Sequence, residues 1–188
     1  LIVFAKGSNS GYVPVGGVVI SADIAATFDD RVFPGGLTYS GHPLATASIV
    51  GSIDAMREEK VNEHAAEIGE KVIGPGLRDL MDKHKVIGEV RGLGVFWALD
   101  LVTDRATREP LAPYAGTSPA MTELVAECKK RFLIPFTNFN RMHVVPPATV
   151  SEAEVTEGLA TLDDVFGIIE RQLRRIFSAP AFSRHDFR

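Results

Sequence analysis

The chain begins with the stretch that decides its fold, LIVFAKGSNSGYVPVGGVVIS at residues 1–21. Residues 1–5 are a continuous apolar run, which is typical of a strand buried on both faces. Residues 6–11 are rich in glycine and serine and indicate a loop. Residues 13–21 return to a strand pattern. Lys6 is therefore expected directly after a buried strand, at the start of a loop.

The position of Lys6 suggests a chemical role for its amine. In open α/β sheets ligands collect at the carboxyl ends of the strands, where Lys6 is expected to lie. Partial burial there favours the neutral form of the amine. A neutral amine can form a Schiff base with an aldehyde cofactor and can move protons. On position alone, however, a surface lysine at a strand end is the better explanation.

The rest of the chain alternates predicted helices and strands, which is typical of α/β and α+β folds. A long helix is expected from about Leu44, and Gly74-Pro75-Gly76 should kink or end it. Ser151 and Glu154 form a capping-box pattern at the start of the last helix. The remaining predicted elements are a helix at 23–28, helical turns at 77–84, two strands or a hairpin at 86–102, a loop at 103–118, a helix at 119–131, a strand at 142–145, and in the last helix an apolar stripe of Val155, Leu159, Leu162, Phe166, Ile169 and Leu173.

Composition and charge exclude several classes of function. The 188 residues carry a net charge of -4, and the basic residues are scattered, so no basic face for nucleic acid is expected. The single cysteine, Cys128, excludes an internal disulfide, and the histidines lack metal-ligand spacing, so we expect no metal. No apolar run approaches the roughly 20 residues that span a membrane, and we do not expect residues 1–5 to be part of a signal peptide. We expect a cytoplasmic protein.

A cluster of polar residues lies just before the predicted long helix. Thr38, Ser40 and His42 belong to the sequence TYSGHP. Hydroxyls and free backbone N–H groups ahead of a helix can bind an anion such as phosphate. Ordinary helix capping explains the same cluster at least as well.

Two arginines are candidates for binding a carboxylate. Arg91 lies in VRGLG and Arg141 in FNRMHVVPP. Either could bind a carboxylate through two parallel hydrogen bonds. A lone arginine more often pairs with a structural acid, and Glu89 and Asp100 are near Arg91. The glycine-rich stretches match neither the dinucleotide nor the P-loop fingerprint, which disfavours nucleotide binding.

Four motifs taken together resemble the class III aminotransferases. They are FAKGSNSGYVPVGGVVIS, LTYSGHPLATAS, VIGEVRGLGVFWALDLV and VVPPATVSEAEVTEGL. They occur in the order that this family shows and cover nearly the whole chain, from Leu1 to about Leu173. Any one motif is a weak signal, whereas four in the right order and spacing are specific.

The resemblance implies an α/β protein with the fold type I of the transferases that depend on pyridoxal 5'-phosphate (PLP). The chain would hold part of the large domain and the C-terminal α+β small domain. We expect the large-domain part at 1–75, including the long helix, the small domain at 76–178 and a tail at 179–188.

The resemblance also implies the cofactor PLP and roles for three residues. Lys6 matches the catalytic lysine that forms a Schiff base with PLP and then acts as the base. Thr38 matches the threonine that hydrogen-bonds the cofactor phosphate of the neighbouring subunit. Active sites would thus be shared in a homodimer, and a tetramer stays open. Arg141 is the candidate for substrate binding, because His143 stands where many members that act on amino acids have an arginine.

The implied function is transfer of an amino group from an amine, ω-amino acid or amino acid to a 2-keto acid. The histidine at 143 makes an ω-amino acid or simple amine at least as plausible a donor as an α-amino acid. Two alternatives stay open: an aminomutase or racemase of the same family, or a fragment that acts only as a structural or dimerisation module. The family's N-terminal half supplies further cofactor contacts, so we expect the chain as it stands to be an incomplete catalyst.

Overall fold

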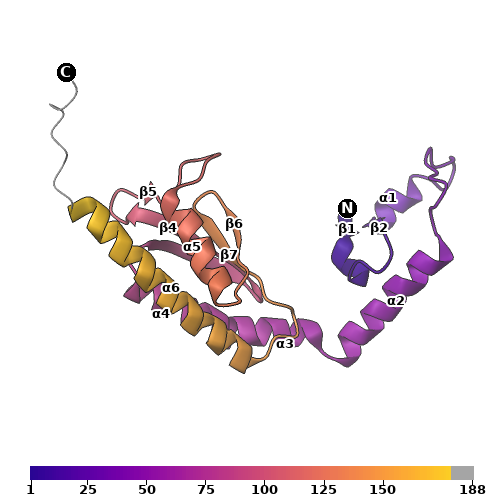
Figure 1. Cartoon of the computed structure of the whole chain (residues 1–188). Coiled ribbons are helices and arrows are strands. Elements are labelled where there is room, and N and C mark those ends of the chain that lie inside the picture. Colours follow the sequence, from indigo (N-terminus) through magenta and orange to yellow (C-terminus); the bar gives the residue numbers. More distant parts are fainter. Residues whose placement is uncertain (179–188) are drawn as a thin grey trace, which may run out of the picture. The chain divides into compact units, whose positions relative to one another are not determined.

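The computed structural model describes residues 1–178 (Figure 1). The chain forms two compact units, Leu1–Asn62 (unit 1) and Glu63–Arg188 (unit 2). The domain boundary that the sequence predicts after residue 75 lies inside unit 2, and the assignment of the two domains stays a prediction. The predicted tail at 179–188 lies outside the described residues.

Unit 1 contains a small antiparallel sheet and two helices. Its elements are β1 (Ile2–Ala5), η1 (Lys6–Asn9), β2 (Gly16–Val19), α1 (Ala22–Ala26) and α2 (Pro43–Glu58). Strands β1 and β2 pair with Ala5 opposite Gly16, so the chain returns on itself just after the loop that carries Lys6. The two predicted strands and the short helix are confirmed.

The expected burial of the first strand is wrong for this structure. The side chains of Leu1, Ile2 and Val3 are largely exposed, at 78%, 66% and 77%. Among the described residues β1 pairs with β2 alone, and a two-stranded sheet buries little of either face. The apolar run therefore forms a strand, but one whose faces remain open.

The long helical stretch is divided differently from the prediction. It consists of α2, α3 (Val61–Ile68), the π-helical segment η2 (Gly69–Ile73) and α4 (Gly74–Lys83). Helix α2 ends before Lys60, which adopts a left-handed φ of 52°. Pro75 lies in the first turn of α4, where its missing N–H costs no helical hydrogen bond. Gly74-Pro75-Gly76 were predicted to kink or end the long helix: the π-helical segment does end at Ile73, but α4 continues directly from it at Gly74.

Unit 2 is built on an antiparallel sheet in the order β3-β4-β7-β6, with β5 beside β4. Its strands are β3 (Ile87–Leu93), β4 (Phe96–Asp104), β5 (Glu109–Pro110), β6 (Phe136–Asn138) and β7 (Arg141–Val144). The predicted hairpin is confirmed as β3 and β4, which turn at Gly94 with a φ of 55°. Strand β7 is also confirmed, whereas β5 and β6 were not predicted.

Three helices cover one face of this sheet: α4, α5 (Pro119–Lys130) and α6 (Glu152–Ser178) (Figure 1). Leu99 and Leu101 of β4 are fully buried beneath them. Each such side chain stabilises the fold by about 1.5–3 kcal/mol relative to exposure. The opposite face, which we call the open face, carries exposed apolar side chains, namely Leu93, Phe96 and Phe136.

The predicted capping box of the last helix is confirmed. The backbone N–H of Ser151 donates to Glu154 Oε2 at 2.8 Å, and the backbone N–H of Glu154 donates to Ser151 Oγ at 3.3 Å. Hydrogen bonds from the backbone N–H and then the hydroxyl of Ser151 to the carboxylate hold the pKa of Glu154 below its usual range. Behind the cap, the predicted apolar stripe of α6 packs into the core.

Glycines allow the helical stretch to pack closely against its neighbours. A Cβ atom at Gly69 would lie 2.0 Å from the carbonyl oxygen of Gly94, and one at Gly74 would lie 2.6 Å from the ring of Trp97. A Cβ atom at Gly76 would lie 2.4 Å from Leu159 Cδ1. The backbone of η2 therefore touches the backbone of the hairpin turn, and the backbone of α4 packs directly against the side chains of Trp97 and Leu159.

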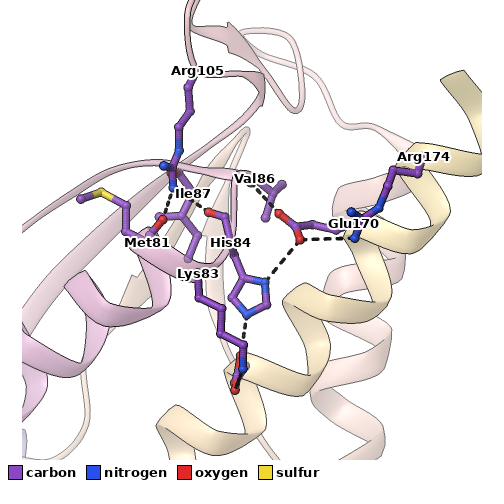
Figure 2. Close-up of polar contacts among 9 residues, drawn as sticks. Met81, Lys83, His84, Val86, Ile87, Arg105, Glu170 and Arg174 are labelled. Atoms are coloured by element: carbon purple, nitrogen blue, oxygen red, sulfur yellow. Dashed lines mark hydrogen bonds and ion pairs between the residues drawn. The ribbon is translucent and has the colours of Figure 1, made fainter.

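A buried histidine links the end of α4 to α6 (Figure 2). His84 Nε2 lies 2.5 Å from Asp163 Oδ1, and His84 Nδ1 lies 3.5 Å from Glu170 Oε2. Lys83 also binds the Asp163 carboxylate, and the backbone N–H of Val86 donates to Glu170 Oε1 at 3.1 Å. Two acids of α6 thus hold the segment between α4 and β3.

Arg105 binds backbone carbonyls of the same segment (Figure 2). Its Nη2 donates to the carbonyls of Met81 and His84, and its Nε donates to that of Ile87 at 2.9 Å. A cation at the C-terminus of a helix satisfies free carbonyls and opposes the helix dipole. The side chain of Arg105 is therefore the C-terminal cap of α4.

Substitution of Gly69 tests the close backbone contact. Gly69→Ala should lower the free energy of unfolding by about 2–3 kcal/mol, because neither backbone can move away cheaply. Gly158→Ala is the matched control, since a Cβ atom there meets nothing within 4 Å and should stabilise α6 by about 0.5–1 kcal/mol. Urea unfolding measures both. Equal effects of the two substitutions would contradict the contact.

Substitution of Asp163 tests the histidine cluster. Hydrogen bonds from Lys83 and then His84 hold the pKa of this carboxyl below its ordinary value of 3.8. Its contribution to stability is therefore complete above that value and is lost as the pH falls through the lowered pKa. Asp163→Asn should cost about 1–2 kcal/mol at pH 7, allowing for partial exposure.

Denaturant unfolding between pH 7 and pH 2 measures this effect. The difference between the wild type and the Asp163→Asn variant should shrink toward the acid end. Asp164→Asn removes an exposed neighbouring carboxylate of α6 and should change stability by less than about 0.5 kcal/mol. A loss at Asp163 that stays constant down to pH 2 would argue against the ion pairs.

Candidate functional site

Lys6 lies at the end of β1, in the first position of the 3-10 turn η1. Its φ of 55° is left-handed, a conformation that non-glycine residues rarely adopt and that costs about 1–3 kcal/mol. The side chain is exposed, and no carboxylate pairs with its amine within residues 1–178. The predicted position after a strand is confirmed, whereas the expected partial burial of the amine is wrong for this structure, because the side chain is exposed.

The loop that carries Lys6 is fastened by Asn9, which sequence reasoning missed. Asn9 is 1% exposed. Its side-chain amide donates to the carbonyl of Val13 at 2.7 Å and to Ser48 Oγ at 2.9 Å, and its oxygen accepts from the Gly11 N–H at 3.1 Å. The asparagine in a glycine- and serine-rich loop was visible in the sequence, but its partner on α2 was not.

Thr38 lies in a turn just before α2 of unit 1. The Ser40 N–H donates to the carbonyl of Leu37 at 2.9 Å, which closes this turn. The Thr38 side chain is exposed. His42 occupies the N-cap position of α2, and its side chain makes no capping hydrogen bond. Ordinary capping therefore does not account for Thr38, Ser40 and His42. No hydrogen bond joins Thr38 to Lys6 in the described part of the chain.

Arg141 lies in unit 2, on β7, where it lines a hollow of about 420 Å³. Three more arginines line this hollow: Arg91, Arg105 and Arg108. Arg91 binds Asp100 at 2.5 Å, and this hydrogen bond raises the pKa of Arg91. Arg108 binds Glu89 at 2.9 Å.

Among the four arginines of the hollow, Arg141 alone has no ion pair or side-chain hydrogen bond within the described residues. Its guanidinium is half-buried and lies near the aromatic pair Tyr114 and Phe139, whose ring centroids are 5.1 Å apart. The hollow therefore contains one guanidinium, that of Arg141, which has no ion-pair partner among the described residues. This arrangement suits the anionic group of a small molecule.

His143 lies two residues along the same strand, in an apolar setting. Its ring contacts Phe136 and Phe96 edge-to-face, with centroids 5.2 Å and 5.8 Å apart. Such pairs stabilise packing by about 0.5–1.5 kcal/mol beyond the buried area. The histidine thus holds an aromatic cluster on the open face.

Other reactive groups in the described residues do not form a site. No cluster of three potential metal ligands occurs among them. Burial raises the pKa of the Cys128 thiol to about 11, which makes it a poor nucleophile. In residues 1–178 no helix has the length and apolar character to cross a bilayer.

Known proteins share both the sequence and the fold. The family profile for aminotransferase class-III matches residues 1–166. The 5-aminovalerate aminotransferase DavT of Pseudomonas aeruginosa is 34% identical over 171 residues, which are 88% of this chain and 37% of that protein. The ethanolamine-phosphate phospho-lyase homolog 1 of Caenorhabditis elegans is 32% identical over 176 residues, which are 91% of this chain and 36% of that protein.

A solved structure gives the same result for the fold. The taurine:2-oxoglutarate aminotransferase of Bifidobacterium kashiwanohense, in complex with PLP and glutamate, has a TM-score of 0.83 and 37% identity. The match covers 91% of this chain and 38% of that one. The chain thus spans less than two fifths of the length of these relatives. The predicted fold type I of the PLP-dependent transferases is confirmed, and the chain belongs to the class III aminotransferase family.

Proposed function

We propose that the protein containing this chain is a PLP-dependent transaminase that moves an amino group from an amine or ω-amino acid to a 2-keto acid. Membership of the family supports this proposal. So do relatives that are named as aminotransferases of 5-aminovalerate, taurine, putrescine and 4-aminobutyrate. The observation that carries the proposal is Lys6, exposed at a strand end within the matched region.

The residues of unit 1 fit this cofactor, which offers an aldehyde and a phosphate. The Lys6 amine is exposed and the Thr38 hydroxyl is not used to cap α2. Ser8 Oγ, two residues from Lys6, is buried with no hydrogen-bond partner in the described structure. A buried polar group without a partner is costly, so a polar ligand beside this loop would satisfy it.

Lys6 and Thr38 have separate chemical tasks. Lys6 would hold PLP covalently through Nζ and would accept the proton from the substrate carbon that bears the amino group. Thr38 would donate its hydroxyl hydrogen to the cofactor phosphate of the neighbouring subunit. When bound, PLP supplies an electron sink for the charge that develops at the substrate carbon.

We further propose a homodimer in which each active site uses Thr38 of the neighbouring subunit. Residues 1–75 would belong to the PLP-binding large domain and residues 76–178 to the small domain. Because the chain spans less than two fifths of its relatives, further groups around the cofactor would come from the rest of the protein.

The donor class follows from two observations. The substrates in the names of the four relatives all carry the amine on a terminal carbon. The position three residues before Pro146 holds His143, which packs between phenylalanines. Arg141, which has no ion-pair partner among the described residues, would instead bind the carboxylate or sulfonate of the donor or the carboxylate of the keto acid.

Borohydride reduction of the full-length protein with PLP tests the proposed function. A pyridoxyl mass should appear on the peptide that contains Lys6. Lys6→Ala should abolish it and lower kcat by more than about 10²-fold. Thr38→Ala should keep the covalent mass but weaken PLP binding about 10- to 100-fold, because a hydrogen bond to a charged group is lost.

Two results would oppose this function. A full-length protein that is labelled only at other lysines would exclude Lys6 as the anchor. Turnover of the donor without any keto acid would indicate a lyase, aminomutase or racemase instead, and one relative is indeed named a phospho-lyase. Steady-state assays of 5-aminovalerate and taurine, each with and without pyruvate or 2-oxoglutarate, separate these reactions.

Substitution of Arg141 tests its role in substrate binding. Arg141→Ala should raise KM for the anionic substrate about 10- to 100-fold, with a smaller effect on kcat, because it removes binding rather than chemistry. Arg108→Ala is the matched control from the same hollow: its exposed pair with Glu89 should contribute little. Equal KM values for both variants would show that Arg141 does not bind the substrate.

A further inference from the structure

We propose that Asn9 is a positioning residue that fixes Lys6 relative to the helix following Thr38. This rests on the proposed function, in which Lys6 binds the PLP of its own subunit and Thr38 binds the phosphate of the PLP in the neighbouring subunit. The loop around Lys6 is conformationally demanding: Lys6, Ser10 and Gly11 have φ values of 55°, 54° and 76°. Left-handed lysine and serine are unfavourable, so other interactions must maintain this loop.

The side chain of Asn9 supplies these interactions. Both of its amide hydrogens and its oxygen are used, in bonds to Val13, Ser48 and Gly11. The bond from the Gly11 N–H spans left-handed Ser10, and the bond to the Val13 carbonyl closes the loop beyond Gly11. Because Asn9 is 1% exposed, water cannot replace these partners, and their loss would leave buried polar groups unpaired.

The bond to Ser48 extends the effect from the loop to α2. Ser48 Oγ accepts from Asn9 at 2.9 Å and donates to the Ala45 carbonyl within the helix at 2.7 Å. Helix α2 begins at Pro43, five residues after Thr38. One amide therefore connects the turn that starts at Lys6 with the helix whose first turn follows Thr38. The residue that would anchor PLP in one active site and the residue that would reach the neighbouring active site are thus held in one rigid segment of the chain.

This role differs from that of an ordinary structural asparagine. If Asn9 only stabilised the fold, its loss would lower stability and leave the chemistry of the remaining folded protein unchanged. If it positions Lys6, the amine of the folded protein will be misplaced. A displacement of about 1 Å at a catalytic group can cost on the order of 10²-fold in rate. The lost quantity should be kcat rather than KM.

The experiment uses full-length protein loaded with PLP and three variants. Asn9→Ala should lower kcat about 10- to 100-fold with KM little changed, and should shift the pH midpoint of the cofactor absorbance band. Ser48→Ala removes the link to Asn9 and the bond from Ser48 Oγ to the Ala45 carbonyl but keeps Asn9 itself; it should shift both in the same direction but less. Thr46→Ala is the control, because within residues 1–178 Thr46 Oγ1 bonds only to the carbonyls of His42 and Pro43 at the start of its own helix.

Hydrogen exchange of the cofactor-free proteins gives a readout independent of activity. The amides of Gly11 and Tyr12 should exchange faster in Asn9→Ala than in wild type or Thr46→Ala. If Asn9→Ala does not fold, Ser48→Ala decides alone. Folded Asn9 and Ser48 variants with wild-type kcat and pH midpoint, still reduced onto Lys6, would overturn the inference while leaving the proposed function intact. A wild type that is not labelled at Lys6 would overturn both.

Discussion

The direct contact between the backbones at Gly69 and Gly94 is the constraint on which unit 2 depends. The carbonyl of Gly94 also accepts a hydrogen bond from Trp97 Nε1 at 2.7 Å, and the indole ring lies against Gly74. The hairpin turn, the indole and the helical stretch therefore meet with no side chain between the helix and the turn. The π-helical segment η2 begins at Gly69 of this contact. Helix α4, which covers the core, continues directly from η2.

Local signals in the sequence were sufficient for elements whose partners are close along the chain. The capping box of α6 lies within four residues, and the β3–β4 hairpin needs only Gly94 at its turn. The break after Glu58 was missed because Glu59 and Lys60 carry no glycine or proline signal, although Lys60 is left-handed. The burial of β1 was misjudged because an apolar pattern shows only that a face can be covered.

In the candidate site, too, features set by neighbouring residues could be predicted from the sequence, whereas features set by distant residues could not. The position of Lys6 at a strand end was readable, since strand and loop adjoin in the sequence. Its chemical role came only with the four-motif resemblance. The dependence of its loop on Asn9 could not be read, because Asn9 and Ser48 are 39 residues apart. Likewise, acidic partners for Arg91 were expected from the sequence, but only the fold revealed that Arg108 pairs with Glu89 while Arg141 pairs with no acid among the described residues.

The glycines of α4 and η2 differ in whether a larger residue could replace them during evolution. The obstacle to a side chain at Gly69 is the backbone of Gly94, which no substitution can remove. The obstacle at Gly76 is the end of the Leu159 side chain, and a smaller residue at 159 would make room. Homologues should therefore keep glycine at position 69 independently of their other residues, whereas positions 76 and 159 should covary, a larger residue at one accompanying a smaller residue at the other.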